Sequence, residues 1–322
     1  MKNFWEKLPK PFFALAPLDD VTDAAFRRLI VSFGKPDVMY TEFASADGLI
    51  LAAAERQDSV RRKLIFSERE RPIVAQLFTA SPERMEQAAY IVLEQGLDGI
   101  DINMGCPDRS VEKSRCGAAL MKNPKLARRL IQAALKAGLP VSVKTRIGYA
   151  RDEIDAWVPE LLAENLSAII IHARTRNELS DVPARWDSVA RAVKIRDELG
   201  SKALIIGNGD VEDIPDARAK AGESGCDGVM LGRSIMGNPW LFADRQTPPT
   251  SRERLEALAE HLKLFDELLS STTNYAIMKK HFKGYIHGWT PTEYEYGAKE
   301  LRLRLMETEN VAEALAIIDD AL

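Results

Sequence analysis

One of only three cysteines in the chain stands where an apolar, strand-like segment ends. The segment DINMGCPDRS, residues 101–110, leads through Cys106 directly into Pro107. The other cysteines are Cys116 and Cys226, and their odd number and spacing suit neither a disulfide framework nor a zinc knuckle. We therefore expect reduced thiols, and Cys106 is either a buried structural cysteine or a thiol that takes part in chemistry.

Further polar residues follow the other apolar runs of the chain. In a barrel of parallel strands, the carboxyl ends of all strands meet at one face, and the active site lies there. A single Asn or Asp at such an end can be an ordinary turn residue, but chance is a poor explanation for a whole ring of them. The ring comprises Thr41, Glu42, Gln76, Asn103, Cys106, Lys144, Arg146, His172, Arg174, Asn208, Asp210 and Arg233.

Two glycine-containing loops indicate a phosphate site. They read GNGD, residues 207–210, and GRSIMGNPW, residues 232–240. Glycine lets backbone N–H groups approach an anion closely, and Arg233 can add a bidentate contact. Either loop alone can be a simple turn, but the pair, after the last two strands, predicts a bound phosphorylated cofactor.

Lys144 and His172 stand at neighbouring strand ends, where a cation and an imidazole can face the polar edge of a flavin and stabilise negative charge on the reduced ring. A single histidine is usually a structural group, and Arg174, two residues later, improves the functional interpretation only modestly. His261, His281 and His287 share no metal-ligand spacing with an acidic partner. The sequence therefore predicts no metal site.

The elements that must position these residues are eight apolar runs between residue 11 and about residue 244. Amphipathic stretches separate most of them, for example SPERMEQAAYIVLEQG and NPKLARRLIQAALKAG. The first opens with Ser81 and Pro82, and both end in glycine, as helices commonly do. The runs are apolar on both faces, which is typical of strands buried between helices. A doubly wound sheet usually has fewer strands and a Gly-rich loop after the first, so we expect an α/β fold, a (β/α)8 TIM barrel. The runs read FFALAP, DVMYTEF, PIVAQLFT, GIDINMGC, PVSVKTRIG, SAIIIHAR, ALIIGNGD and DGVMLGR.

A break rich in proline, threonine and charge, RQTPPTSRE, follows the eighth run, and the remaining pattern is helical. We therefore expect a barrel domain over residues 1–244 and a C-terminal helical domain over residues 245–322. Composition bounds the class of protein: the 322 residues are 46% hydrophobic and carry a formal net charge of −4. The N-terminal stretch lacks the apolar run of a signal peptide and no run is long enough to span a membrane, so we expect a cytoplasmic protein. The net charge neither supports nor excludes RNA as a partner, because steering depends on the distribution of charge.

Taken in order, several segments resemble the tRNA-dihydrouridine synthase family. The resemblance covers about residues 11–290, and the ordered set is far more specific than any one motif. It extends into MKKHFKGYIHG, which is similar to a Lys-His-containing segment of the family's helical domain. The other segments are FALAPLDDVTDAAFRRL, TEFASADGL, INMGCPDRSVEKSRCGAALM, VSVKTRIG, IHARTR, IIGNGDV and GCDGVMLGRSIMGNPWLF.

The resemblance implies an FMN-dependent enzyme that uses NADPH, or NADH, to reduce the C5–C6 double bond of specific uridines in tRNA. Reduction needs a hydride from flavin N5 to C6 of uracil and a proton to C5. By resemblance Cys106 is the proton donor. Cys116 lies in the loop SRCGAAL and Cys226 begins an apolar strand, so we expect both to be structural. The residues implied to bind FMN are Ala16, Pro17, Leu18, Gln76, Lys144, His172, Asn208, Gly209, Asp210, Gly232 and Arg233.

The same resemblance implies how RNA is bound. Asn103 is expected to contact the target uracil, which must leave its stack to reach the mouth of a barrel. We expect a monomer without a metal. Basic residues near the mouth or on the helical domain are candidate phosphate contacts, although a solvated surface is an equal alternative for each. They are Arg174, Arg176, Lys279, Lys280 and Lys283.

The chain departs from the family pattern at three places. The first run ends APLDD, where the family usually has Met after the proline, so Asp19 and Asp20 bring acid near the flavin entrance. The loop NELSDVPARWD replaces the usual Tyr and Gly, and Cys116 is not expected at its position. Two alternatives stay open. One is an FMN barrel oxidoreductase acting on a free small molecule such as a pyrimidine, which shares the phosphate loops and Lys144 but does not need the helical tail. The other is a catalytically idle RNA-binding relative, which predicts loss of Cys106 or of the phosphate loops, and neither is lost.

Overall fold

The fold is that of a computed structural model, which describes residues 3–51, 54–243, 245–287 and 297–322. Eight parallel strands form one sheet in the order β1-β8-β7-β6-β5-β4-β3-β2. The ring closes just before β2. There Val38 forms a β-bridge with Ala14, and the carbonyl of Val38 accepts from the N–H of Leu15 at 3.1 Å. The predicted (β/α)8 barrel is therefore confirmed. The strands are β1 Phe12–Leu15, β2 Met39–Ser45, β3 Ile73–Phe78, β4 Gly99–Met104, β5 Val141–Arg146, β6 Ala168–His172, β7 Leu204–Asn208 and β8 Gly228–Leu231.

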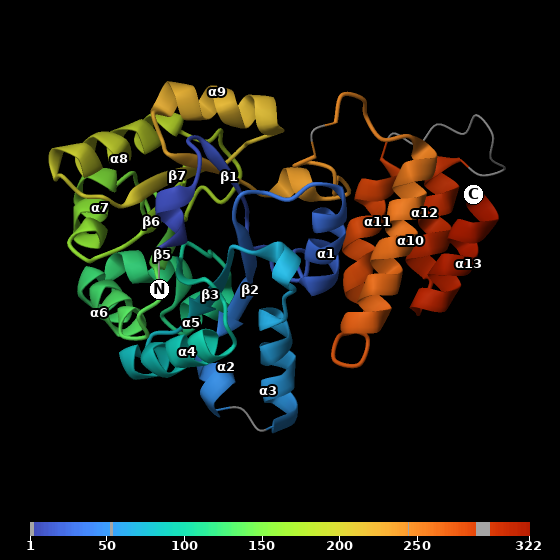
Figure 1. The fold of residues 1–322 in the computed structure, drawn as a ribbon, viewed down its shortest axis with the longest axis horizontal. Helices are drawn as coiled ribbons and strands as arrows, with labels where there is room; N and C mark the ends of the chain where they lie inside the picture. Colours follow the sequence, from blue (N-terminus) through green and yellow to red (C-terminus); the bar gives the residue numbers. More distant parts are fainter. Residues whose placement is uncertain (1–2, 52–53, 244, 288–296) are drawn as a thin grey trace. The chain divides into compact units, whose positions relative to one another are not determined.

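Helices follow the strands and cover the outside of the ring (Figure 1). Helix α4, Pro82–Glu94, begins at Ser81, whose side chain accepts from the N–H of Arg84. Helix α6, Pro124–Leu135, begins in the same way at Asn123. The start and the glycine end predicted for α4 are confirmed, because Gly96 follows with a positive φ. The other helices after β2 to β7 are α2 Ala46–Leu51, α3 Ala54–Arg61, α5 Arg109–Lys113, α7 Ile154–Leu162, α8 Trp186–Glu198 and α9 Ile214–Ser224.

The interior of the barrel is packed by alternate residues of the strands. Phe12, Tyr40, Val74 and Ile170 belong to one buried cluster, and Trp5 joins it from a short 3₁₀ helix, Phe4–Lys7. Since successive side chains of a strand point to opposite faces, this cluster identifies the inward-facing positions of β1, β2, β3, β6, β7 and β8. The polar residues of the site are found by continuing the same alternation.

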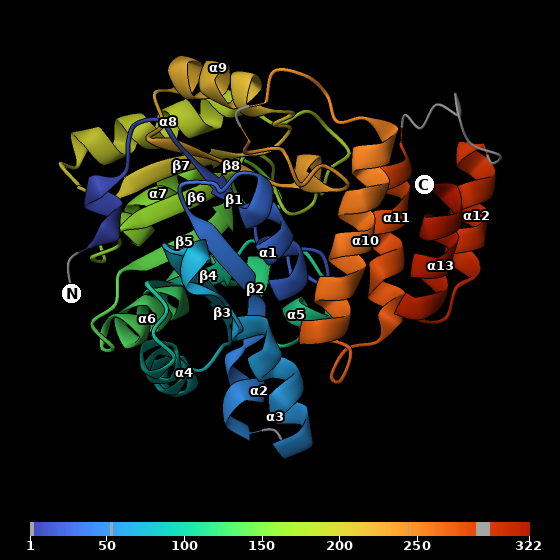
Figure 2. The same ribbon diagram turned by 45° about the vertical axis from the view of Figure 1, so that its right-hand side comes forward.

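The chain divides into two compact units. The barrel unit comprises the described parts of Met1–Pro17, Pro36–Leu64 and Arg71–Gly232, and the helical unit comprises those of Leu18–Lys35, Ile65–Glu70 and Arg233–Leu322. The predicted C-terminal helices are present, and residue 244, where we expected the boundary, lies outside the described residues. In the helical unit the C-terminal helices run side by side (Figure 2). Its helices are α1 Ala24–Phe33, α10 Ser251–Leu268, α11 Lys279–Ile286, α12 Ala298–Glu307 and α13 Val311–Ala321.

A buried ion pair fixes α1 within the helical unit. Arg27 and Glu70 have no solvent exposure, and the Arg27 Nε lies 2.7 Å from a Glu70 carboxylate oxygen. Arg27 also donates to the backbone carbonyls of Thr22 and Ile65, and Glu70 accepts from the N–H of Ser67. These bonds tie the segments before α1 and at residues 65–70 to one guanidinium. Among the described residues, no helix has the length and apolar character needed to cross a membrane.

Candidate functional site

Strand alternation sends the predicted site residues into the mouth of the barrel. Gln76 follows the core residue Val74 by two positions, and His172 follows Ile170 in the same way. Residues two apart on a strand share a face, so each of these side chains forms the layer above the core. Asn103 on β4 and Lys144 on β5 are register partners, as are His172 on β6 and Asn208 on β7, so each pair lies on one face of the sheet.

A chain of hydrogen bonds crosses this layer and ends at the backbone of Cys106. The amide nitrogen of Gln76 donates to Asp101 at 2.7 Å, and its oxygen accepts from the amide of Asn103 at 3.0 Å. The oxygen of Asn103 then accepts from the N–H groups of Gly105 at 3.2 Å and of Cys106 at 2.9 Å. Because an amide has one donor end and one acceptor end, Asp101 fixes the orientation of Gln76 and, through it, that of Asn103.

Asp101 was not among the residues predicted from the sequence. It is fully buried on β4, and burial raises its pKa to about 6, although hydrogen bonds from Ser142 and Gln76 act in the opposite direction. Ser142 donates to it at 2.6 Å. The available signal was an acidic residue inside the apolar run GIDINM, since buried carboxylates are rare unless they are hydrogen-bonded.

Lys144 points a cation into the same layer. Its pKa is lowered to about 8, mainly by burial and then by the nearby Arg146, while Asp101 and Cys106 raise it. An ammonium group has three donors, yet the one acceptor at hydrogen-bond distance among the described residues is Asn208 Oδ1, at 3.4 Å. The site therefore offers a cation whose hydrogen-bonding capacity is largely unused.

Arg146 supports the loop that carries Cys106. Its Nε donates to the carbonyl of Gly105 at 2.9 Å, and its Nη1 donates to the carbonyls of Thr175 and Leu179. Burial lowers its pKa to about 10, and interaction with Cys106 raises it. Cys106 thus lies close enough to Lys144 and Arg146 for its charge to affect the pKa of both side chains.

His172 and Arg174 form a connected pair at the end of β6. Arg174 is 3% exposed; it pairs with Asp210, and its Nη1 lies 3.2 Å from the Nε2 of His172. Arginine only donates, so this contact assigns the acceptor role to Nε2 and the proton to Nδ1. Arg174 was predicted to contact RNA; in this structure its guanidinium already contacts Asp210, His172 and the carbonyl of Val182 inside the barrel unit.

The first predicted phosphate loop is tightly built. Gly209 has a φ of 122°, and a Cβ added there would lie 3.0 Å from the Cβ of Ala184 and 3.1 Å from the ring of His172. Only glycine fits this conformation and this space. Asn208 donates to the carbonyl of Met230 at 2.8 Å, which joins this loop to β8.

The remaining predicted cofactor residues lie at the ends of β1 and β8. The N–H of Ala16 donates to the carbonyl of Leu231 at 2.8 Å, and Pro17 and Leu18 continue the chain from there. Gly232 follows β8, and Arg233 opens the 3₁₀ helix Arg233–Ile235.

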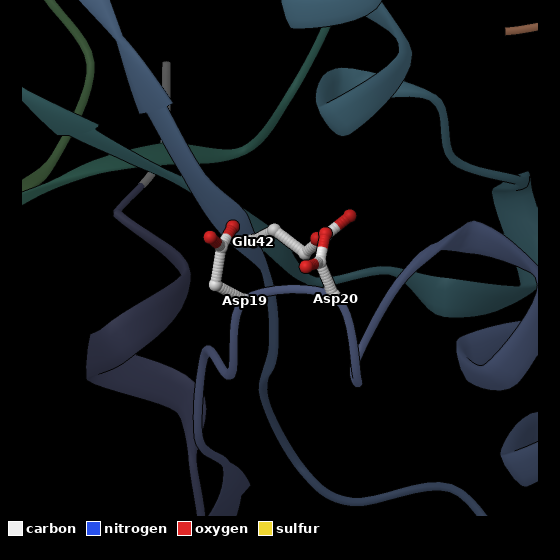
Figure 3. Close-up of side chains that lie close together, drawn as sticks. All are labelled: Asp19, Asp20 and Glu42. Carbon is white, nitrogen blue, oxygen red and sulfur yellow. The ribbon is translucent and has the colours of Figure 1, made fainter. Parts of the chain in front are cut away.

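The acidic departures from the family pattern, Asp19 and Asp20, lie on one loop. Figure 3 shows Asp19 and Asp20 on the loop that follows β1 and Glu42 on β2. Asp20 has a φ of 54° and pairs with Lys280 at 2.9 Å. Lys279 donates to the carbonyl of Met306 at 2.8 Å. Lys279 and Lys280, two of the basic residues predicted to bind RNA, therefore make intramolecular contacts in this structure.

The other two cysteines are buried, and all three are free. Burial raises the pKa of the Cys116 thiol to about 11, and that thiol donates to the carbonyl of Ser114 at 3.3 Å. Cys116 lines a cavity of about 490 Å³ beside the ion pair of Asp47 with Arg84. Cys226 donates to the carbonyl of Gly228 at 3.1 Å. These thiols contact backbone carbonyls outside the ring of site residues, as structural cysteines do.

The site fits an anionic ligand with a flat polar edge. Lys144 has unused donors, and its pKa and that of Arg146 are lowered by burial and by neighbouring cations, so a negative charge bound there relieves an unfavourable arrangement. Lys144 therefore suits the polar edge of a flavin ring, with Gln76 and His172 as further polar contacts. The loop at Gly209, where a side chain would meet Ala184 and His172, suits a flavin phosphate through its backbone.

One protein family matches nearly the whole chain. The family model described as "Dihydrouridine synthase (Dus)" matches residues 14–322. The chain is 40% identical over 321 residues to a "Probable tRNA-dihydrouridine synthase 2" of Bacillus subtilis (strain 168), covering 99% of this chain and 96% of the relative. It is 39% identical to a "Probable tRNA-dihydrouridine synthase" of Staphylococcus aureus (strain COL), with 99% and 95% covered. Among solved structures, histamine dehydrogenase from Rhizobium sp. 4-9 is similar in fold, with a TM-score of 0.50 and 12% identity over 78% of this chain and 48% of that chain.

Proposed function

Because this chain belongs to the dihydrouridine synthase family, we propose that it is an FMN-dependent oxidoreductase that reduces the C5–C6 double bond of uridine in tRNA, with NADPH or NADH as reductant. The observation that carries the proposal is the placing of Cys106. It follows β4 at the mouth of the barrel, its N–H is bound by Asn103, and it lies beside the cations Lys144 and Arg146. A thiol held there can deliver a proton to a base that enters the mouth.

The chain's own residues would hold the flavin that supplies the hydride and would supply the proton. FMN, when bound, supplies the hydride that adds to C6 of uracil. Residues of the barrel unit would hold it: Gln76, Lys144, His172, the backbone of Ala16 and Pro17, and the loops at Asn208, Gly209, Asp210 and Gly232, from which Leu18 and Arg233 continue the chain. Lys144 would stabilise negative charge on the reduced ring.

Cys106 would give its proton to C5 of uracil, and a thiolate would remain. Lys144 and Arg146 favour this step, because nearby cations stabilise a thiolate. Asn103 keeps Cys106 in place through its oxygen, and its second amide hydrogen can be offered to a carbonyl of uracil. A positioned general acid typically contributes roughly 10²–10⁴-fold to the rate.

The RNA must deliver one base into the mouth of the barrel. A uridine inside a stack cannot reach it, so the target has to be turned out, at a cost of about a few kcal/mol that is smallest in loops. Lys283 and Lys280 remain candidate phosphate contacts; Lys280 already pairs with Asp20.

The proposal is tested by mapping dihydrouridine in RNA from cells with and without this protein, complemented by wild type or by Cys106→Ala. We expect specific uridines to lose the modification without the protein and to regain it only with wild type. Purified protein should be yellow and release FMN on denaturation. An unchanged dihydrouridine map contradicts the assignment, and reduction of free pyrimidines but not of RNA supports the small-molecule alternative.

A further inference from the structure

We propose that Arg176 and Glu112 form a positioning pair that holds the Cys106 loop in its reactive place. The inference rests on the proposed function, in which Cys106 donates the proton, and it gives Arg176 a role other than the RNA contact predicted from the sequence. All residues in the argument belong to the barrel unit.

The peptide groups around Cys106 are held on several sides. The N–H of Cys106 donates to Asn103 at 2.9 Å, and its carbonyl accepts from the N–H of Ala118 at 2.9 Å. The carbonyl before it, that of Gly105, accepts from Arg146. The carbonyl after it, that of Pro107, accepts from the Nη2 of Arg176 at 3.3 Å. Arg176 is thus the side chain that fixes the loop on the far side of the cysteine.

Glu112 holds Arg176 in this position. It lies on α5, which begins three residues after Cys106, and its Oε2 accepts from the Nε of Arg176 at 2.9 Å and also from its Nη2. The Glu112 hydrogen bond raises the pKa of Arg176. The two side chains are only 20% and 12% exposed, so water competes weakly for the pair.

The pair joins two loops that are far apart in the sequence. Arg176 lies after β6, where its own N–H donates to the carbonyl of Gly148 at 2.9 Å. Arg146 donates to Thr175 and Leu179 in the same loop and to Gly105 in the cysteine loop. Arg146 and Arg176 therefore hold the loop of Cys106 against the loop after β6. Glu112 connects Arg176 to α5.

The energetics favour a positional role over a purely stabilising one. The second carboxylate oxygen of Glu112, Oε1, is buried and has no hydrogen-bond partner among the described residues. An ion pair with such an unsatisfied atom recovers little net stability, because desolvation offsets much of the attraction. The ion pair still fixes geometry, because Arg176 bound to Glu112 directs its Nη2 toward the carbonyl of Pro107.

The test compares Arg176→Gln, Arg176→Lys and Glu112→Gln with wild type and with Arg128→Gln. Arg128 on α6 pairs with Glu164, which follows α7, at 2.7 Å, so its variant controls for losing an ion pair elsewhere in the barrel unit. The first readout is the rate at which iodoacetamide alkylates Cys106 in the holoenzyme, followed over pH by peptide mass spectrometry. This readout does not depend on uridine reduction. The second readout is kcat and KM for tRNA.

We expect Arg176→Gln and Glu112→Gln to change the alkylation rate of Cys106 severalfold and to lower kcat on the order of tenfold, with KM for tRNA within about twofold. Arg176→Lys should fall between them and wild type, because it keeps the charge but not the two-point geometry. Arg128→Gln should match wild type. If the enzyme reduces no uridine, the proposed function fails while the alkylation rates still decide this inference.

Two results overturn the positioning role. One is an unchanged alkylation rate and pH profile in both Arg176→Gln and Glu112→Gln, provided that each variant has the wild-type circular dichroism spectrum. The other is a raised KM for tRNA and a weaker salt dependence in Arg176→Gln with kcat unchanged, which assigns Arg176 to RNA phosphate instead. If Glu112→Gln does not fold, Arg176→Lys decides between the outcomes.

Discussion

Two neutral histidines inside the helical unit make its stability sensitive to acid. His261 on α10 and His281 on α11 are completely buried, with ring centroids 4.6 Å apart. The His261 ring stacks on Phe26 of α1, and the His281 ring contacts Phe26 at a tilt. Burial lowers the pKa of His281 to about 3, with Lys280 as a second cause, and lowers that of His261 well below its usual value, with His281 as a second cause. Both ring nitrogens of His281 lack a hydrogen-bond partner among the described residues.

The sign of the effect follows from these lowered pKa values. The folded protein keeps His281 neutral, whereas the unfolded chain binds a proton below about pH 6.5. The free energy of unfolding is therefore fully retained above that pH and falls as the pH decreases toward about 3. At pH 5 the loss from His281 alone is about 2 kcal/mol, since the unfolded histidine is then about 97% protonated.

The perturbation is His281→Leu, which keeps a similar volume and removes the titrating group. Urea denaturation between pH 8 and pH 5 should show a decrease in the free energy of unfolding that is smaller by about 2 kcal/mol in the variant than in wild type. His287→Leu is the matched control, because His287 is exposed. Equal decreases in wild type and His281→Leu refute the reasoning, whatever the stability of the variant at pH 8.

Three further predictions concern burial and backbone. Arg27→Met should lower the free energy of unfolding by about 3–5 kcal/mol in urea denaturation, because it leaves the Glu70 carboxylate buried and unpaired, and adding Glu70→Gln should restore part of the loss. Gly209→Ala should lower the melting temperature and the FMN content of purified protein, since φ is 122° and the new Cβ meets Ala184 and His172; normal FMN content contradicts it. Asp101→Asn should weaken FMN binding about tenfold in fluorescence titrations, because Gln76 loses its charged acceptor; unchanged affinity argues against that linkage.

The sequence predicted the barrel and the main layer of its site because both follow from short-range pattern. Strand runs that are apolar on both faces predict a parallel sheet between helices, and the last polar residue of each run marks the mouth. Lys144 and His172 were found in this way. Asp101 could not be predicted from the same pattern, because it lies inside its strand and not at the strand's end.

Contacts between segments that are far apart in the sequence could not be predicted from it. Glu112 and Arg176 are separated by 64 positions and meet only because the barrel brings the loops after β4 and β6 together. A basic residue near the mouth therefore indicated an RNA contact, although a carboxylate faces it. The extent of the helical unit could not be predicted for the same reason. A change of composition near residue 245 marks a boundary along the chain, but it cannot show that α1, far earlier in the sequence, packs with α10.

The central claim is that Cys106 is the proton donor of uridine reduction. Stopped-flow measurements separate the two half-reactions: reduction of bound FMN by NADPH, and its reoxidation on addition of unmodified tRNA. Cys106→Ala should keep the first rate near that of wild type and lose roughly 10²–10⁴-fold in the second, because the C5 proton must then come from water. Cys116→Ala should keep both rates. Normal tRNA-dependent reoxidation and dihydrouridine formation in Cys106→Ala would contradict the account and leave Cys106 as a structural cysteine.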